Sequence, residues 1–161
     1  MADLTKGELI LLINGVNQTN FLAGYLGSAS KISLDLRYID LSYLNLEGLN
    51  FWYANLEGAN LIGANLTRAN LTGANLESAN LQDTNLTGAN LSYARLDFCS
   101  LINSNLTSSN LDFTNLNLAI LDGADLTKAS FEGTERSDKY LSLIVKGYTP
   151  KPNREEDDLP F

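Results

Sequence analysis

A five-residue repeat runs without interruption through the middle of the chain and limits its fold more than any other feature. A large apolar residue recurs at every fifth position from Leu36 to Phe131, which gives twenty repeats with eighteen Leu and two Phe at these positions. The residue two places earlier is small, most often Ala, and the residue directly before is Asn in thirteen of the twenty repeats. A repeat of fixed period is the signature of a solenoid.

A period of five fits neither a straight helix nor a straight strand. Five residues of α-helix advance by about 500°, so successive Leu would be rotated by roughly 140° and would form no stripe. In an extended strand, an odd period would send alternate Leu to opposite faces. The Leu share one interior only if the chain bends once per repeat. The Leu and the small residue before it then point inward, and the other three residues point outward.

The run from Ala54 to Asn80, ANLEGANLIGANLTRANLTGANLESAN, resembles the pentapeptide-repeat family, whose consensus is A(D/N)LXX. The resemblance implies an all-β solenoid, a right-handed quadrilateral β-helix with four repeats per coil. Twenty repeats then make about five coils, in a stack roughly 24 Å tall at a strand spacing of about 4.8 Å. The residues favour four repeats per coil independently, because large residues replace Ala at the small position in four successive repeats only: Leu34, Ile39, Leu44 and Leu49.

The repeat divides the chain into an N-terminal cap at 1–33, the β-helix at 34–133, and a C-terminal cap with a tail at 134–161. The open ends of a solenoid need such cover. Thr5 and Glu8 match a capping box and predict a short helix followed by a connector, with an added edge strand as the alternative. Ser137 predicts the start of a second helix, and the acidic, Pro-containing residues after Gly147 predict a mobile tail.

The composition argues against catalysis. The chain has no His and a single Cys, so it lacks the usual acid–base group at neutral pH and the ligands of His- and Cys-rich metal sites. We expect no enzyme activity, no cofactor and no metal, with Cys99 in the core. The net charge of −8 argues against direct nucleic-acid binding. The apolar run near the N-terminus is too short to span a membrane, and we expect a cytoplasmic protein.

With four repeats per coil, residues twenty apart lie one above the other. The sequence therefore predicts which outward residues are neighbours on the surface. Glu57, Glu77 and Asp97 form an acidic strip. The strip is either a contact for a basic partner or a cation, or a solvated face relieved by the nearby Arg37 and Arg95, and we favour the solvated face. The Asn column is interpreted as framework, because stacked amides can bond along the ladder.

Large apolar residues also occupy outward positions late in the repeats. Such a cluster is typical of a contact site, for a protein partner or for a second copy in a homodimer, and cover by the chain's own C-terminal segment is the equally weighted alternative. The candidate residues are Tyr93, Phe98, Ile102, Phe113, Leu118 and Ile120.

We therefore predict a non-enzymatic structural or interaction protein that binds a macromolecular partner through a rigid surface. The resemblance implies a bacterial, cyanobacterial-type protein and offers an alternative, since some pentapeptide-repeat proteins imitate duplex DNA and inhibit or protect a type II topoisomerase such as gyrase. Eleven acids against four bases between Leu34 and Gly133 fit that alternative loosely. A third class is a scaffold tethered through the acidic tail.

Overall fold

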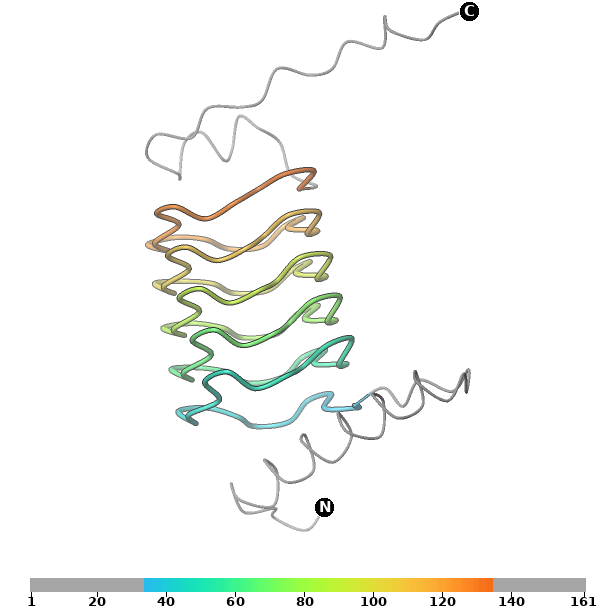
Figure 1. Ribbon diagram of the computed structural model, residues 1–161. Helices are drawn as coiled ribbons and strands as arrows, with labels where there is room; N and C mark the ends of the chain where they lie inside the picture. Colours follow the sequence, from blue (N-terminus) through green and yellow to red (C-terminus); the bar gives the residue numbers. More distant parts are fainter. Residues whose placement is uncertain (1–33, 135–161) are drawn as a thin grey trace, which may run out of the picture.

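A computed structural model describes residues 34–134 of the protein, so both predicted caps, apart from Thr134, lie outside the described residues. The described chain winds into a stack of coils (Figure 1). Parallel β-bridges join residues twenty apart, from Asp35 with Asn55 to Asn110 with Ser130. Each coil therefore holds four repeats, and the right-handed quadrilateral β-helix is confirmed.

The five positions of a repeat have fixed places on the square. The small and central residues point inward, the residues before and after the central one face outward on a side, and the last residue forms a corner. Coils 1 to 5 are residues 34–53, 54–73, 74–93, 94–113 and 114–133. Sides 1 to 4 are the first to fourth repeats of each coil, and each side ends at the corner of the same number. Side 1 therefore lies between corner 4 and corner 1.

Regular elements are minimal in this fold. Each repeat contributes one bridged residue rather than an extended strand, and residues 34–134 contain no helix. Among these residues there is accordingly no helix that is long and apolar enough to cross a membrane.

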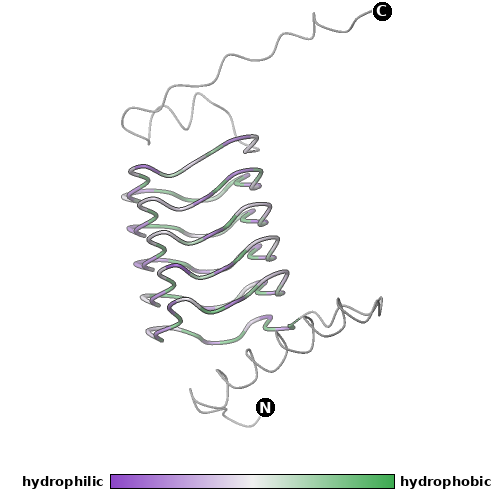
Figure 2. Ribbon diagram, viewed as in Figure 1, coloured by the Kyte–Doolittle hydropathy of each residue, from purple (hydrophilic) through white to green (hydrophobic). Residues whose placement is uncertain are grey.

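The core is a continuous stack of central residues. Those from Leu41 to Leu116 are at most 1 % exposed, and burial of each stabilises the fold by about 1.5–3 kcal/mol. Figure 2 shows the hydrophobic positions recurring from coil to coil. In coil 1, the larger Ile39, Leu44 and Leu49 pack partly buried against this core.

Each corner is a tight turn. The N–H of the next small residue donates to the carbonyl of the central residue, as from Ala59 to Leu56 at 3.0 Å. The corner residue has a positive φ in all twenty repeats, and only seven of the twenty are Gly. The left-handed conformation costs other residues roughly 1–2 kcal/mol. Thirteen corners therefore hold a side chain in spite of a backbone cost.

The Asn column ties each turn to the coil beside it. Asn55 Oδ1 accepts a hydrogen bond from the N–H of Glu57 at 3.2 Å, and Asn75 Nδ2 donates to Asn55 Oδ1 at 3.2 Å. The same two bonds recur with Asn70, which accepts from Thr72 and donates to Asn50. These bonds agree with the predicted framework role.

Candidate interaction surface

Tyrosines at the corners of coil 1 cover glycines in coil 2. A Cβ added to Gly58 would lie 2.6 Å from two ring carbons of Tyr38, so the ring occupies the space that a side chain would need. The Tyr38 hydroxyl donates to Glu57 at 3.1 Å, and this hydrogen bond raises the pKa of Tyr38. The same cover pairs Tyr43 with Gly63 and Tyr53 with Gly73.

These three tyrosines are exposed rings that the predicted contact residues, all late in the repeats, did not include. Tyr38, Tyr43 and Tyr53 are 71 %, 78 % and 48 % exposed. A signal was present in the sequence, because each Tyr is followed twenty residues later by Gly. The Tyr–Gly pairs give these exposed rings a role in the fold.

Corner 4 carries two of the predicted contact residues in a stacked column. The rings of Tyr93 and Phe113 lie 5.0 Å apart and within 8° of parallel. Phe113 in turn covers Gly133, where an added Cβ would lie 2.5 Å from the ring. Both rings stay about half exposed. Part of their role is therefore packing along the column, as for the coil 1 tyrosines.

Corner 1 differs in coils 4 and 5, because its apolar residues there, unlike Tyr38 in coil 1, cover no glycine among the described residues. Leu118 lies twenty residues after Phe98, in the next coil. Phe98 is 56 % exposed at a φ of 58°, and Leu118 is 69 % exposed at a φ of 56°. Ile120 lies beside them on side 2, where it takes the Asn position opposite Ser100 and is 44 % exposed. Ile102 is partly buried on the same side. We call Phe98, Leu118, Ile120 and Ile102 the corner 1 group.

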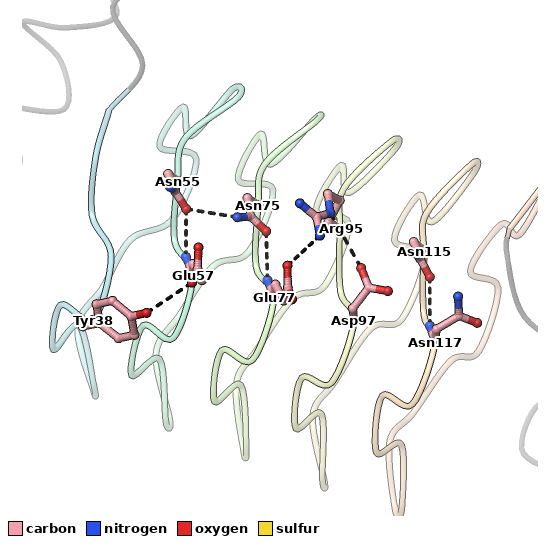
Figure 3. Close-up of polar contacts among 9 residues, drawn as sticks. All are labelled: Tyr38, Asn55, Glu57, Asn75, Glu77, Arg95, Asp97, Asn115 and Asn117. Carbon is pink, nitrogen blue, oxygen red and sulfur yellow. Dashed lines mark hydrogen bonds and ion pairs between the residues drawn. The ribbon is translucent and has the colours of Figure 1, made fainter.

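The six candidate residues thus form two groups rather than one patch. Tyr93 and Phe113 lie on corner 4, the corner 1 group lies on corner 1 and side 2, and side 1 separates them. Side 1 is polar there, with Arg95 and Asp97 in coil 4 and Asn115 and Asn117 in coil 5 (Figure 3).

The acidic strip on side 1 is neutralised only in part, by one arginine. Arg95 Nη2 lies 2.6 Å from Glu77 Oε2, and Arg95 Nε lies 3.8 Å from Asp97 Oδ2 (Figure 3). Asp97 is only 9 % exposed, so it is a covered carboxylate and not part of a solvated row. At the start of the side, Arg37 binds Asp35 at 2.8 Å, and this contact lowers the pKa of Asp35.

Negative charge is otherwise spread evenly around the square. Residues 34–134 contain eleven acids and four bases, a net charge of −7. Each of the four sides carries a net −2, and the corners together carry +1. The described residues contain no cluster of three or more His, Cys, Asp or Glu side chains suited to a metal ion, and Cys99 is fully buried.

Comparison with known proteins gives one family and several solved structures. The family model described as pentapeptide repeats matches residues 39–77, 69–107 and 99–135. A pentapeptide repeat protein from the Arabidopsis thaliana thylakoid lumen is 29 % identical, covers 71 % of this chain and 78 % of its own, and has a TM-score of 0.51. No curated protein sequence matches the chain.

Two further solved structures are less similar. A pentapeptide repeat protein from Nostoc PCC 7120 is 27 % identical over 76 % of this chain and 88 % of its own, with a TM-score of 0.35. QnrB1, a plasmid-mediated fluoroquinolone resistance protein, is 18 % identical over 68 % of this chain and 63 % of its own, with a TM-score of 0.30. The Arabidopsis likeness supports the fold, and none of the three indicates a partner for this chain.

Proposed function

Because this chain belongs to the pentapeptide-repeat family, whose members are generally structural rather than enzymatic, we propose that it binds another protein through the rigid surface of its β-helix. The contact is made by the corner 1 group, with Tyr93 and Phe113 across side 1. The observation that carries this proposal is the exposure of Phe98 and Leu118 at strained corners where they cover no glycine of residues 34–134.

The backbone cost of these two residues argues for a use outside the fold. A left-handed Phe or Leu costs roughly 1–2 kcal/mol relative to Gly, and an apolar side chain that stays more than half exposed recovers little of that cost by burial. Seven corners already carry Gly, so the turn accepts it. Exposed apolar clusters of this kind mark contact sites, because a partner removes them from water.

The backbone at Phe98 is also held in place by the fold. The residues on either side of Phe98 along the chain, Asp97 and Cys99, are both buried, and the N–H of Phe98 donates to Asn117 in the next coil at 2.9 Å. A surface fixed in this way loses little conformational entropy on binding, which favours association.

A photo-crosslinker tests the proposal. p-Benzoylphenylalanine is placed at Leu118, and the control places it at Lys128, which is also an exposed corner residue in coil 5 but lies on the diagonally opposite corner. We expect a defined protein adduct from position 118 that is absent from position 128 and is reduced by Phe98→Gly. The absence of any adduct, or the same adducts from both positions, contradicts the proposal.

A second candidate is the DNA-mimicking inhibitor or protector of a type II topoisomerase such as gyrase. The even spread of −2 on each side favours it, because duplex DNA is also negative all around. The likeness is partial. Over roughly 24 Å, duplex DNA carries about 14 charges at one per 1.7 Å, against the −7 of residues 34–134. Both candidates assume a cytoplasmic protein.

Gyrase supercoiling assays decide this second candidate. A DNA mimic inhibits supercoiling, and the triple variant Glu57→Gln, Glu77→Gln, Asp97→Asn weakens that inhibition. No inhibition by the unaltered chain at tens of micromolar, about the weakest useful affinity, removes the candidate.

A further inference from the structure

Side 1 has a charge pattern that the other three sides lack. Among the described residues, it is the one side with bases, and they lie in both of its outward columns. The column before the central residues reads Asp35, Asn55, Asn75, Arg95 and Asn115. The column after them reads Arg37, Glu57, Glu77, Asp97 and Asn117. At both heights where the first column carries a charge, the second carries the opposite charge.

We infer that side 1 binds side 1 of a second copy, with the two solenoids parallel. This inference rests on the proposed function and names the partner. A two-fold axis parallel to the stack brings the first column of one copy opposite the second column of the other at the same height. Arg95 then faces Asp97 of the second copy. Asp35 likewise faces Arg37, and the amides of Asn55 and Asn75 face carboxylates.

The charges also select this orientation over the antiparallel one. If the second solenoid ran in the opposite direction, each column would face itself with the order of coils reversed. Glu77 would then face Glu77, and Glu57 would face Asp97. Facing carboxylates repel, so the antiparallel pairing is disfavoured, and like charges are a common means of excluding a wrong arrangement.

The apolar corners complete the same surface. In the parallel pair, corner 4 of one copy meets corner 1 of the other, so Tyr93 faces Phe98 and Phe113 faces Leu118. These contacts cover side chains that are 46–69 % exposed in the single chain. Two apolar contacts on either edge shield the central Arg95–Asp97 pairs from water, as the rim of a hot spot does.

One carboxylate oxygen of Asp97 lacks a hydrogen-bond donor among the described residues. Its buried Oδ2 accepts no hydrogen bond among the described residues, and the guanidinium of Arg95 is 3.8 Å away and engaged with Glu77. When the carboxylate turns outward, Arg95 of the second copy can supply that donor. Charged hydrogen bonds of this kind are roughly twice as strong as neutral ones.

The size of side 1 predicts a weak dimer. A face roughly 24 Å tall and three or four residues wide is smaller than the about 800 Å² per partner of a standard interface. We therefore expect a dissociation constant on the order of tens of micromolar.

Charge reversal in trans tests the inference on the full chain. Arg95→Asp alone puts acid opposite acid, and Asp97→Arg alone puts base opposite base. An equimolar mixture of the two restores both opposite-charge pairs. By sedimentation velocity up to about 500 µM, we expect each variant to dissociate at least about tenfold more readily than the unaltered chain, and the mixture to regain most of that affinity.

Controls keep the test decisive. Lys128→Asp, at corner 3, should leave the dimer unchanged. Because Asp97 is covered and its replacement can disturb the fold, the experiment is repeated with Asp35→Arg and Arg37→Asp, whose side chains are 56 % and 49 % exposed. The inference is overturned by a monomeric unaltered chain over the whole range, or by mixtures no tighter than single variants for both pairs. A crosslink from position 118 to a different protein, without self-adducts, overturns it and leaves the proposed function standing.

Discussion

Coils 2 and 3 keep the repeat almost perfectly, whereas coils 4 and 5 depart from it and still keep the same backbone. In coils 2 and 3, all eight Asn positions hold Asn, and seven of the eight small positions hold Ala. In coils 4 and 5 taken together, only three of the eight Asn positions hold Asn, and only four of the eight small positions hold Ala. The bridges and the positive corner φ values continue unchanged through both regions.

The difference shows which positions determine the coil. The central Leu and the corner turn are common to both regions, so they are sufficient to keep the chain winding. The Asn position, the small position and the corner side chain can vary without loss of the fold. Coils 4 and 5 use that freedom to place Arg95, Phe98 and Leu118 on one part of the surface, which is where we locate the contact.

Truncation of a central Leu should have the largest effect on stability. The loss should be equal in the two regions, because both share the Leu stack. Leu76→Ala in coil 3 and Leu106→Ala in coil 4 should each lower the free energy of unfolding by about 2–5 kcal/mol, since both Leu are fully buried. Gln82→Ala, on an outward position, is the control and should change it little. Denaturant titration measures all three, and a much smaller loss at Leu106 would mean that the irregular coils are loosely packed.

Replacement of a corner glycine should have a smaller effect on stability. A comparison of two such glycines separates the contribution of the tyrosine ring from that of backbone strain. Gly48 and Gly63 have φ values of 65° and 62°, but only Gly63 lies under a ring, that of Tyr43. Gly48→Ala should cost about 1 kcal/mol from the left-handed conformation alone. Gly63→Ala should cost about 1 kcal/mol more, because the ring must move. Equal losses in denaturant titrations would show that the rings are not packed against the glycines.

Coils 3 and 4 also differ in the interior, at one column of small positions. Ser109 is buried, and its Oγ forms no hydrogen bond with the described residues, whereas Ala89 fills the same place in coil 3. Ser109→Ala should raise the free energy of unfolding by about 1 kcal/mol, and Ala89→Ser should lower it by about 1–3 kcal/mol. If Ser109→Ala is destabilising in thermal or chemical unfolding, the hydroxyl has a partner such as a buried water.

Much of the architecture could be predicted from the sequence, because the repeat is set by burial. An inward Leu every five residues requires one bend per repeat, and the switch from Leu49 to Ala54 at the small position indicated four repeats per coil. The bridges at a spacing of twenty residues confirm both the four-repeat coil and the stacking of columns. The caps at 1–33 and 135–161 lie outside the described residues and stay predictions.

The details of the surface were harder to predict, because they depend on side-chain direction. The sequence places Tyr38 at a corner but does not show that its ring leans over Gly58. Likewise, the acidic strip was predicted as a row of three equivalent carboxylates. In the structure, Arg95 pairs with Glu77, and Asp97 is covered. The period assigns a residue to a column, and local packing then decides its exposure.

The most direct test of the contact role is the double variant Phe98→Gly, Leu118→Gly, with Ser78→Gly in the same corner column as control. Chemical unfolding below 1 µM, where we expect a monomer, and sedimentation at high concentration are measured on the same samples. We expect a free energy of unfolding within about 1 kcal/mol of the unaltered chain, because relief of strain offsets the lost contacts, together with about a tenfold loss of self-association. A loss of more than about 2 kcal/mol with self-association unchanged would show that the two residues serve the fold and not a contact.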